Sequence, residues 1–195
     1  MQDTERELKA MLSQEQADKL LKSSAFTETR VQKNTYYDNP DQSLKQNGMA
    51  LRIRTIESDQ VSNQKHPVEA KYILTIKKPL DSITKYEYER PVHTNKLKDL
   101  NEEERSWVQD HLNADQTLDS LNPIASFTTT RHICQFPDAE YSVDHTVFDH
   151  HEDYEAEYEY RKQHDGIKAF NRILSAAGLQ WTKNGPSKIA RAFQS

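Results

Sequence analysis

The stretch DYEAEYEY, residues 153–160, decides the fold because its side chains alternate strictly in character. In an extended strand, the glutamates at positions 155, 157 and 159 fall on one face, and the tyrosines and the alanine fall on the other. Neighbouring like charges on one strand face repel each other, and a face that merely meets water gains nothing from them. We therefore expect these glutamates to face groups of opposite charge.

The same alternation recurs along the chain and predicts six further strands. In one of them Glu5, Glu7 and Lys9 share a face, and in another Arg52 and Arg54 do so. Acidic and basic rows lie on separate segments, as expected if they meet across a cavity. The six further strands are expected at Thr4–Met11, Met49–Ile56, Lys71–Lys78, Tyr86–Arg90, Thr128–Phe136 and Tyr141–Phe148.

Helical segments lie between and after these strands. Ser13 with Gln16 forms a capping box that begins a helix running to about Ser24, and Asn101 with Glu104 begins another. A third is expected over residues 165–177, with Gly178 as its stop, and residues 187–193 form a short basic turn. These elements predict an α+β fold, a closed antiparallel β-barrel of about eight strands with helices packed outside. A sheet whose charged faces are solvated stays open as the alternative.

Composition narrows the class of protein. The 195 residues suit a single domain, 1–195, and the polar stretch 57–67 is expected to be a hairpin loop within it. The formal net charge of -5 argues against general nucleic-acid binding. The lone cysteine, Cys134, excludes an internal disulfide framework and fits a reducing compartment. Without an apolar run long enough for a membrane, we expect a cytoplasmic location, and a homodimer is compatible with the sequence.

Charged motifs resemble a known family when they are taken in order. Glu5-Arg6-Glu7-Leu8-Lys9 resembles the ExExK signature of the CYTH superfamily, the triphosphate tunnel metalloenzymes. The ExExK motif alone is a weak signal, but the ordered set of motifs is specific and covers essentially the whole chain. The order and spacing of the motifs are similar to those of the branch in Gram-positive bacteria that is labelled putative adenylate cyclase or thiamine-triphosphatase-like. The further matching segments are Asn34–Asp38, Leu44, Gly48, Ala50–Arg54, Leu74–Lys77, Tyr86–Arg90, Arg131, Asp144 and Glu155 with Glu157.

The resemblance implies a tunnel that binds a triphosphate and Mg²⁺ or Mn²⁺. Arginine and lysine suit phosphate oxygens, and hard divalent cations prefer carboxylate oxygens. The expected catalytic residues are Glu5, Glu7 and Lys9. The expected phosphate-binding residues are Lys9, Arg52, Arg54, Lys77 and Arg131, with Lys188 and Arg191 at a tunnel mouth. The expected metal ligands are Glu5, Glu7, Asp144, Glu155 and Glu157. The roles of Glu87, Glu89 and Glu159 stay open, and the pair 155/157 is favoured over 157/159 because it leaves a strand end of plausible length.

The expected reaction is metal-assisted hydrolysis of the terminal phosphate of a small-molecule triphosphate, with inorganic tripolyphosphate as the first choice. Adenylate cyclase activity is an alternative, but the sequence offers no feature for reading a nucleobase. A module that binds phosphate polymers without turnover is the other alternative. Rows of like charge inside a barrel also predict that multivalent anions stabilise the fold.

Overall fold

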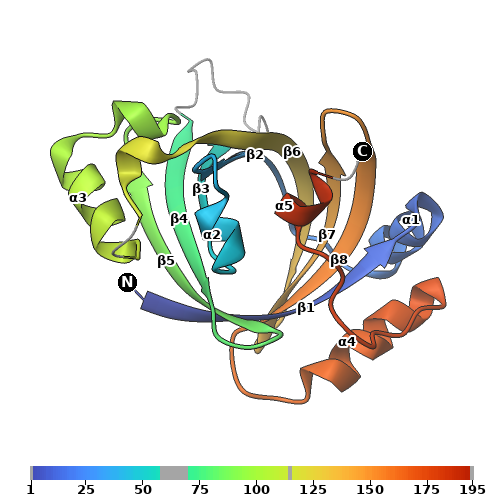
Figure 1. Cartoon of the computed structure of the whole chain (residues 1–195). Coiled ribbons are helices and arrows are strands. Elements are labelled where there is room, and N and C mark those ends of the chain that lie inside the picture. The colour runs from blue at the N-terminus through green and yellow to red at the C-terminus, as the bar shows by residue number, and fades with distance from the viewer. Residues whose placement is uncertain (1, 58–69, 114–115, 194–195) are drawn as a thin grey trace.

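The computed structural model describes residues 2–57, 70–113 and 116–193, which form eight antiparallel strands in a closed barrel (Figure 1). The expected fold is thereby confirmed. The predicted loop at 57–67 lies outside the described residues except for its first residue. The strands are β1 (Gln2–Leu12), β2 (Glu28–Asp38), β3 (Ala50–Glu57), β4 (Lys71–Pro79), β5 (Thr84–Val92), β6 (Asn122–Gln135), β7 (Ala139–Val147) and β8 (Glu152–Tyr160).

Strand β1 closes the barrel because it pairs with two partners. The strands follow the order β1-β5-β4-β3-β2-β6-β7-β8, and β1 pairs with β5 through Gln2–Arg6 and with β8 through Glu7–Leu12. Where β1 changes its partner from β5 to β8, the side chain of Asn184 forms hydrogen bonds with the backbone of β1. Its Oδ1 accepts from the Lys9 amide at 2.7 Å and its Nδ2 donates to the Glu7 carbonyl at 3.0 Å.

The capping boxes predicted from the sequence begin two of the helices. The side chain of Ser13 accepts from the Gln16 amide while the Gln16 side chain accepts from the Ser13 amide, and Asn101 and Glu104 form the same pair of bonds. Gly178 ends the segment that follows α4 in the left-handed conformation, at φ 71°. The helices are α1 (Gln14–Ser23), α2 (Ser43–Gln46), α3 (Glu102–His111), α4 (Gly166–Leu174) and α5 (Lys188–Arg191), with 3₁₀ turns at Leu97–Asp99, Leu118–Ser120 and Ser175–Ala177.

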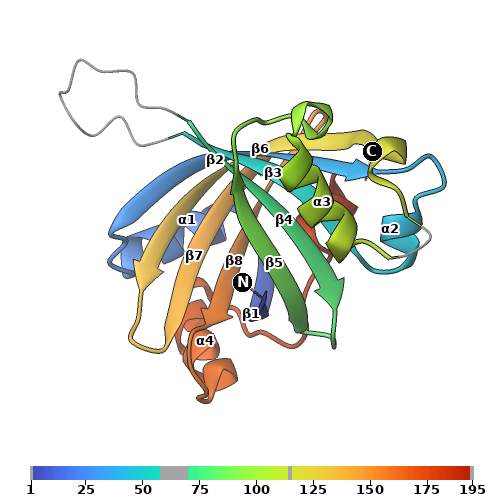
Figure 2. The ribbon, with the colours of Figure 1, turned by 90° about the vertical axis from the view of Figure 1, so that its left-hand side faces the viewer.

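Helices lie outside the barrel in two separate places, α1 with α4 and, apart from them, α3 (Figure 2), and each place has its own apolar layer. Helices α1 and α4 bury Leu20, Phe170 and Leu174 against β1, β7 and β8. Helix α3 and its neighbouring 3₁₀ turns bury Val108 and further leucines against β3, β4 and β5. Because the apolar strand faces point outward into these layers, the charged faces point inward.

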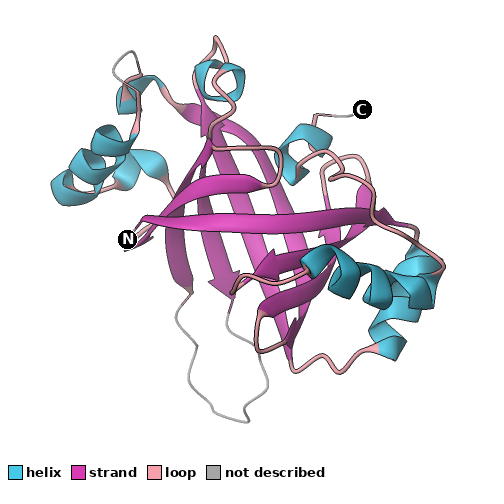
Figure 3. Cartoon of the chain, turned by 90° about the horizontal axis from the view of Figure 1, so that it is seen from below, coloured by secondary structure: helices cyan, strands magenta, loops and turns pink. Residues whose placement is uncertain are grey.

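The short helices α2 and α5 lie over one end of the barrel rather than on its outside (Figures 1 and 3). The Asp38 carboxylate at the end of β2 holds α2, because it accepts from the amides of Leu44 at 3.0 Å and Lys45 at 3.1 Å. Tyr36 faces the barrel interior and Tyr37 packs into the outer apolar layer, as successive residues of a strand do, and a register shift against β6 falls between them.

Three strands differ clearly from the expectations, and one of them is β5, which spans Thr84–Val92 rather than Tyr86–Arg90. Strand β6 begins at Asn122 rather than Thr128, and β2 extends over Glu28–Asp38, where only the resemblance pointed to a strand. Strand β2 carries charged or polar side chains on both faces, so its alternation is not visible in the sequence. No helix among the described residues is both long and apolar enough to cross a lipid bilayer.

Candidate functional site

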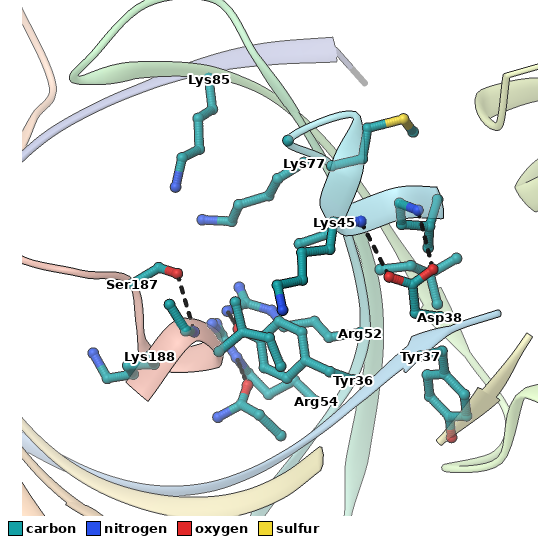
Figure 4. Close-up of a pocket in the computed structure, with 18 of the residues that line it drawn as sticks. Tyr36, Tyr37, Asp38, Lys45, Arg52, Arg54, Lys77, Lys85, Ser187 and Lys188 are labelled. Atoms are coloured by element: carbon teal, nitrogen blue, oxygen red, sulfur yellow. Dashed lines mark hydrogen bonds between the residues drawn. The ribbon is translucent and has the colours of Figure 1, made fainter. Parts of the chain in front are cut away.

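The barrel encloses a cavity of about 230 Å³ that opens beside α2 and α5 (Figure 4). Side chains from β1, β2, β3, β4, β5, β6 and β8 point into it, as the alternating faces predict. The charged residues that line it are Glu5, Glu7, Lys9, Asp38, Lys45, Arg52, Arg54, Lys77, Lys85, Arg131, Glu157 and Lys188. The structure therefore brings most of the predicted site residues together.

Two arginines on β3, Arg52 and Arg54, form what we call the basic wall of the cavity. Arg52 has acidic neighbours, because its Nη2 lies 3.7 Å from a Glu87 oxygen and 4.0 Å from a Glu89 oxygen. Burial would lower the pKa of Arg52, but Tyr36 and Glu87 outweigh it and raise the pKa above its usual value. Arg52 is thus a charged group with acidic neighbours, although its buried Nε donates no hydrogen bond within the described residues.

Arg54 lacks such partners. Its Nε donates to Asn34 Oδ1 at 3.1 Å, and no carboxylate among the described residues lies within 4.0 Å of its guanidinium. Burial, together with Arg52 and Arg131, lowers the pKa of Arg54 to about 10. On β2, the buried Oε1 of Gln32, which also lines the cavity, accepts no hydrogen bond. An anion in the cavity would give Arg54 the partner that the protein itself does not supply.

The three charged positions of the ExExK motif, Glu5, Glu7 and Lys9 on β1, all line the cavity. Glu5 bonds the Lys77 ammonium. The Nζ of Lys9 lies 3.0 Å from Glu7 and 2.8 Å from Glu157. Burial would raise the pKa of Glu5, but Lys77 outweighs it and holds the pKa below its usual range. These side chains are paired across the barrel interior rather than exposed to solvent.

Asp144 on β7 and Glu155 and Glu157 on β8 form what we call the acidic wall. Each offers a carboxylate oxygen within 4.8 Å of the others, and all three are buried. Arg131 donates to Asp144 from Nε at 2.8 Å and from Nη2 at 2.6 Å, and it also bonds Glu157. Burial is the largest influence and would raise the pKa of Asp144 and of Glu157, but Arg131 and the neighbouring lysines together outweigh it, so the pKa of each lies below its usual range. Three charged oxygen donors this close together suit Mg²⁺ or Mn²⁺.

The Lys188 ammonium lies at the centre of the acidic wall. Its Nζ is 2.7 Å from Asp144 Oδ2 and 3.0 Å from Glu157 Oε1, and it also bonds Glu155. Burial lowers the pKa of Lys188 below its ordinary value, and nearby cations add to the effect, although Asp144 acts in the other direction. Lys188 is therefore placed among the predicted metal ligands rather than solely at a mouth.

Arg191 lies behind the acidic wall and not in the cavity lining. Its side chain is only 3% exposed, with Nε 2.6 Å from Asp153 Oδ2 and Nη1 3.0 Å from Glu155 Oε2. A further bond from Nη1 reaches the Pro186 carbonyl at 2.6 Å. These contacts use most of the guanidinium for holding α5 against β8.

The acidic residues with open roles are found beside cations. Glu87 lies 3.1 Å from Lys77, and Glu89, with a side chain 41% exposed, lies at the edge of the basic wall. Glu159 lies 3.0 Å from Arg161, yet burial is the stronger influence and raises the pKa of Glu159 to about 7. These contacts favour charge balance as the role of Glu87.

Three polar residues that line the cavity were not identified from the sequence. Lys85 on β5 points into the cavity (Figure 4) and continues the alternation of Glu87 and Glu89, but beginning that strand at Tyr86 concealed it. Lys45 comes from α2, which has no strand alternation to follow. Gln32 is uncharged and lies on β2, the strand without a visible pattern.

Comparisons of sequence agree with this geometry. The model of the CYTH domain matches residues 3–193. A protein of Bacillus subtilis (strain 168) named putative triphosphatase YjbK is 29% identical over 198 residues, which cover 99% of this chain and 96% of that protein.

Solved structures share the fold. A protein of Bacillus halodurans described as a putative adenylate cyclase matches with a TM-score of 0.76 and 22% identity, over 99% of both chains. A Hippeastrum protein, HpAC1, described as a putative adenylyl cyclase with a dominant triphosphatase activity, matches with a TM-score of 0.69 and 19% identity over 96% of this chain and 94% of that one. At these identities the likeness concerns the fold alone.

Proposed function

Because the chain belongs to the CYTH domain family, we propose that it is a divalent-metal-dependent triphosphatase. Its substrate is inorganic tripolyphosphate or a small organic triphosphate, whose terminal phosphate is hydrolysed inside the barrel. The Bacillus subtilis relative named as a triphosphatase supports this choice of reaction. The charge of the cavity supports it independently.

The observation that carries the proposal is that a basic wall and an acidic wall meet at one small cavity, which the acidic wall reaches through Glu157. The basic wall includes Arg54, a half-buried cation with no carboxylate partner among the described residues. The acidic wall offers three buried carboxylates. A triphosphate with a bound divalent cation carries both complementary charges, negative for the first wall and positive for the second. A purely cationic ligand would satisfy only the acidic wall, and a neutral ligand would satisfy neither.

The residues present fit a divalent metal, because three charged oxygen donors lie within 4.8 Å of one another. Asp144, Glu155 and Glu157 would hold it, with Glu5 and Glu7 on β1 as further carboxylates facing the cavity. When bound, the metal would neutralise charge on the transferred phosphoryl group and lower the pKa of a bound water.

The protein's own groups would position the substrate. Arg52, Arg54 and Arg131 present guanidinium groups and Lys9 and Lys77 present ammonium groups to the same cavity, which suits a chain of phosphates. Glu157, whose pKa is held low, is a weak base. It would therefore orient an attacking water by accepting its hydrogen bond, rather than remove its proton outright.

A substrate panel tests the proposal. Purified protein is supplied with tripolyphosphate, thiamine triphosphate, ATP or GTP, with Mg²⁺, Mn²⁺ or EDTA, and phosphate release is measured. We expect release from tripolyphosphate with a divalent metal and none with EDTA.

Two outcomes would replace the proposal. Formation of cyclic AMP from ATP, without phosphate release from tripolyphosphate, would identify a cyclase of the same family. A tripolyphosphate-induced rise in melting temperature without any phosphate release would identify a binding module.

A further inference from the structure

A protein cation occupies the place where the acidic wall would hold a metal. The Lys188 ammonium contacts all three carboxylates, and it is the same three whose oxygens cluster within 4.8 Å. Its side chain is 10% exposed and the carboxylates are 0–8% exposed, so solvent screens these contacts little. A divalent cation and this ammonium cannot share the position, because both size and like charge exclude it.

The anchoring of α5 does not depend on Lys188. Arg191, one turn along, holds the helix through Asp153, Glu155 and the Pro186 carbonyl. Ser187 caps the helix by accepting from the Ala190 amide at 3.3 Å. The Lys188 side chain can therefore change rotamer while α5 stays in place. It would not have far to move, since Lys188 also lines the triphosphate cavity.

We propose that Lys188 is a built-in counter-cation that a divalent metal displaces from Asp144, Glu155 and Glu157, and that the released ammonium then binds the phosphates of the substrate. The inference rests on the proposed metal dependence of the tunnel. It assigns two partners to one side chain, carboxylates in the metal-free protein and phosphate oxygens in the loaded protein.

This exchange has a thermodynamic consequence for metal binding. Before the metal can bind, the contacts of Lys188 with three carboxylates must break, so Lys188 weakens the affinity of the free protein for metal. In exchange, Lys188 keeps three buried carboxylates from repelling one another while no metal is present. The residue acts as a determinant of metal affinity, separate from any contribution to the chemical step.

The test measures Mn²⁺ binding to the full chain by calorimetry, without substrate, so that turnover plays no part. Lys188→Met keeps the length of the side chain and removes its charge, and we expect it to bind Mn²⁺ at least tenfold more tightly than the natural protein. The matched control is Lys45→Met. Lys45 lines the same cavity and its Nζ donates to Gln42, so the control removes the same charge from a lysine outside the acidic wall. It should change the Mn²⁺ affinity by less than about threefold.

The failures of the two proposals are distinguishable. If the natural protein binds no Mn²⁺ and releases no phosphate from tripolyphosphate, the proposed function falls. If it binds Mn²⁺ and Lys188→Met binds with equal or lower affinity, only the counter-cation role of Lys188 is overturned. An equal gain in Mn²⁺ affinity in Lys45→Met would overturn that role as well, because removal of any positive charge near the cavity would then explain the gain.

A second measurement uses the natural protein, in case Lys188→Met does not fold. Lysines are acetylated briefly with acetic anhydride, with EDTA or with Mn²⁺, and modification is read at each lysine by mass spectrometry. We expect Mn²⁺ to increase modification of Lys188 at least threefold and to leave Lys19, which lies on the outer helix α1, unchanged. Unchanged or reduced modification of Lys188 would contradict its displacement.

Discussion

The basic wall of β3 lines the cavity and the acidic wall of β7 and β8 reaches it through Glu157, but the two walls differ in how their charges are satisfied. Within the described part of the chain, the side chain of Arg54 hydrogen-bonds only to the side-chain amide of Asn34. Each carboxylate of the acidic wall contacts Lys188, and two of them also contact Arg131. In the basic wall, Arg54 lacks the anionic partner that a bound phosphate would provide. In the acidic wall, a bound metal would replace the Lys188 ammonium, so one cation would be exchanged for another. Neutralising one charge in each wall should therefore have opposite effects on the stability of the ligand-free protein.

The largest effect is expected from Glu157→Gln. Glu157 contacts Lys9, Arg131 and Lys188, so its loss removes a proposed metal ligand and leaves three half-buried cations short of a partner. We expect turnover of tripolyphosphate to fall about 10³-fold, equivalent to about 4 kcal/mol, and the ligand-free protein to become less stable. Steady-state phosphate release and urea unfolding measure the two effects.

The control for that change is Glu152→Gln on the same strand. Glu152 lies at the start of β8, with its carboxylate 3.0 Å from His145, and it does not line the cavity. Its turnover should stay within about twofold of the natural protein. A comparable loss in both variants would mean that β8 tolerates no change of charge, and would remove the support that Glu157→Gln gives to the acidic wall.

Arg54→Gln should weaken substrate binding and strengthen the empty fold. Removing a buried cation with no carboxylate partner should raise the free energy of unfolding of the ligand-free protein by about 1–2 kcal/mol. The affinity for tripolyphosphate should fall about 100-fold, because a charged donor to phosphate is lost. Urea unfolding and calorimetry test these signs. A variant destabilised without ligand would show that Arg54 has structural partners after all, and the contrast between the walls would fail.

Anions should stabilise the natural protein in the order of their charge. Tripolyphosphate at 100 times its Kd should add about 2.7 kcal/mol to the free energy of unfolding, and sulfate should add less at the same concentration. In Arg54→Gln the stabilisation by tripolyphosphate should shrink. Melting temperatures in EDTA measure this, and a melting temperature that does not respond to any multivalent anion would favour a sheet with no anion site.

The smallest effect concerns pH and the half-buried Glu159. Its pKa is raised to about 7, so between the usual glutamate range and pH 7 the folded protein binds more protons at this site than the unfolded chain. Glu159 therefore contributes a loss of stability as pH rises from about 4.5 to 7. With allowance for its partly exposed partner Arg161, we expect this loss to be about 1–2 kcal/mol. Glu159→Gln should flatten that part of the profile in EDTA, and an unchanged slope would place the titration elsewhere.

Alternation and capping were enough to predict much of the barrel. Inward-facing rows such as Arg52 with Arg54, and capping residues such as Ser13, are local signals within a few positions of sequence. Strand β2 could not be found this way, because polar side chains cover both of its faces. The inward direction of Lys85 was recoverable in principle, since it continues the row of Glu87.

The partners of the site residues could not be predicted, for a different physical reason. Lys188 meets Glu155 and Glu157 only because the barrel closes and the final segment crosses its end, bringing together side chains 31 or more positions apart. A row of charges on a strand shows that a partner exists, but it carries no information about which distant residue provides it. The resemblance to a family supplied the order of the rows, and neither source revealed that a lysine sits among the predicted metal ligands.

The double pairing of β1 has a consequence for how this protein is made. Lys9 of β1 and Glu157 of β8 are 148 positions apart, so β1 meets its second partner only after the intervening strands have been translated. Asn184, which bonds the backbone of β1 where it changes partner, emerges later still. Until β8 has been translated, Lys9 lacks Glu157 and the barrel stays open along the seam between β1 and β8, so the tunnel is completed late in synthesis.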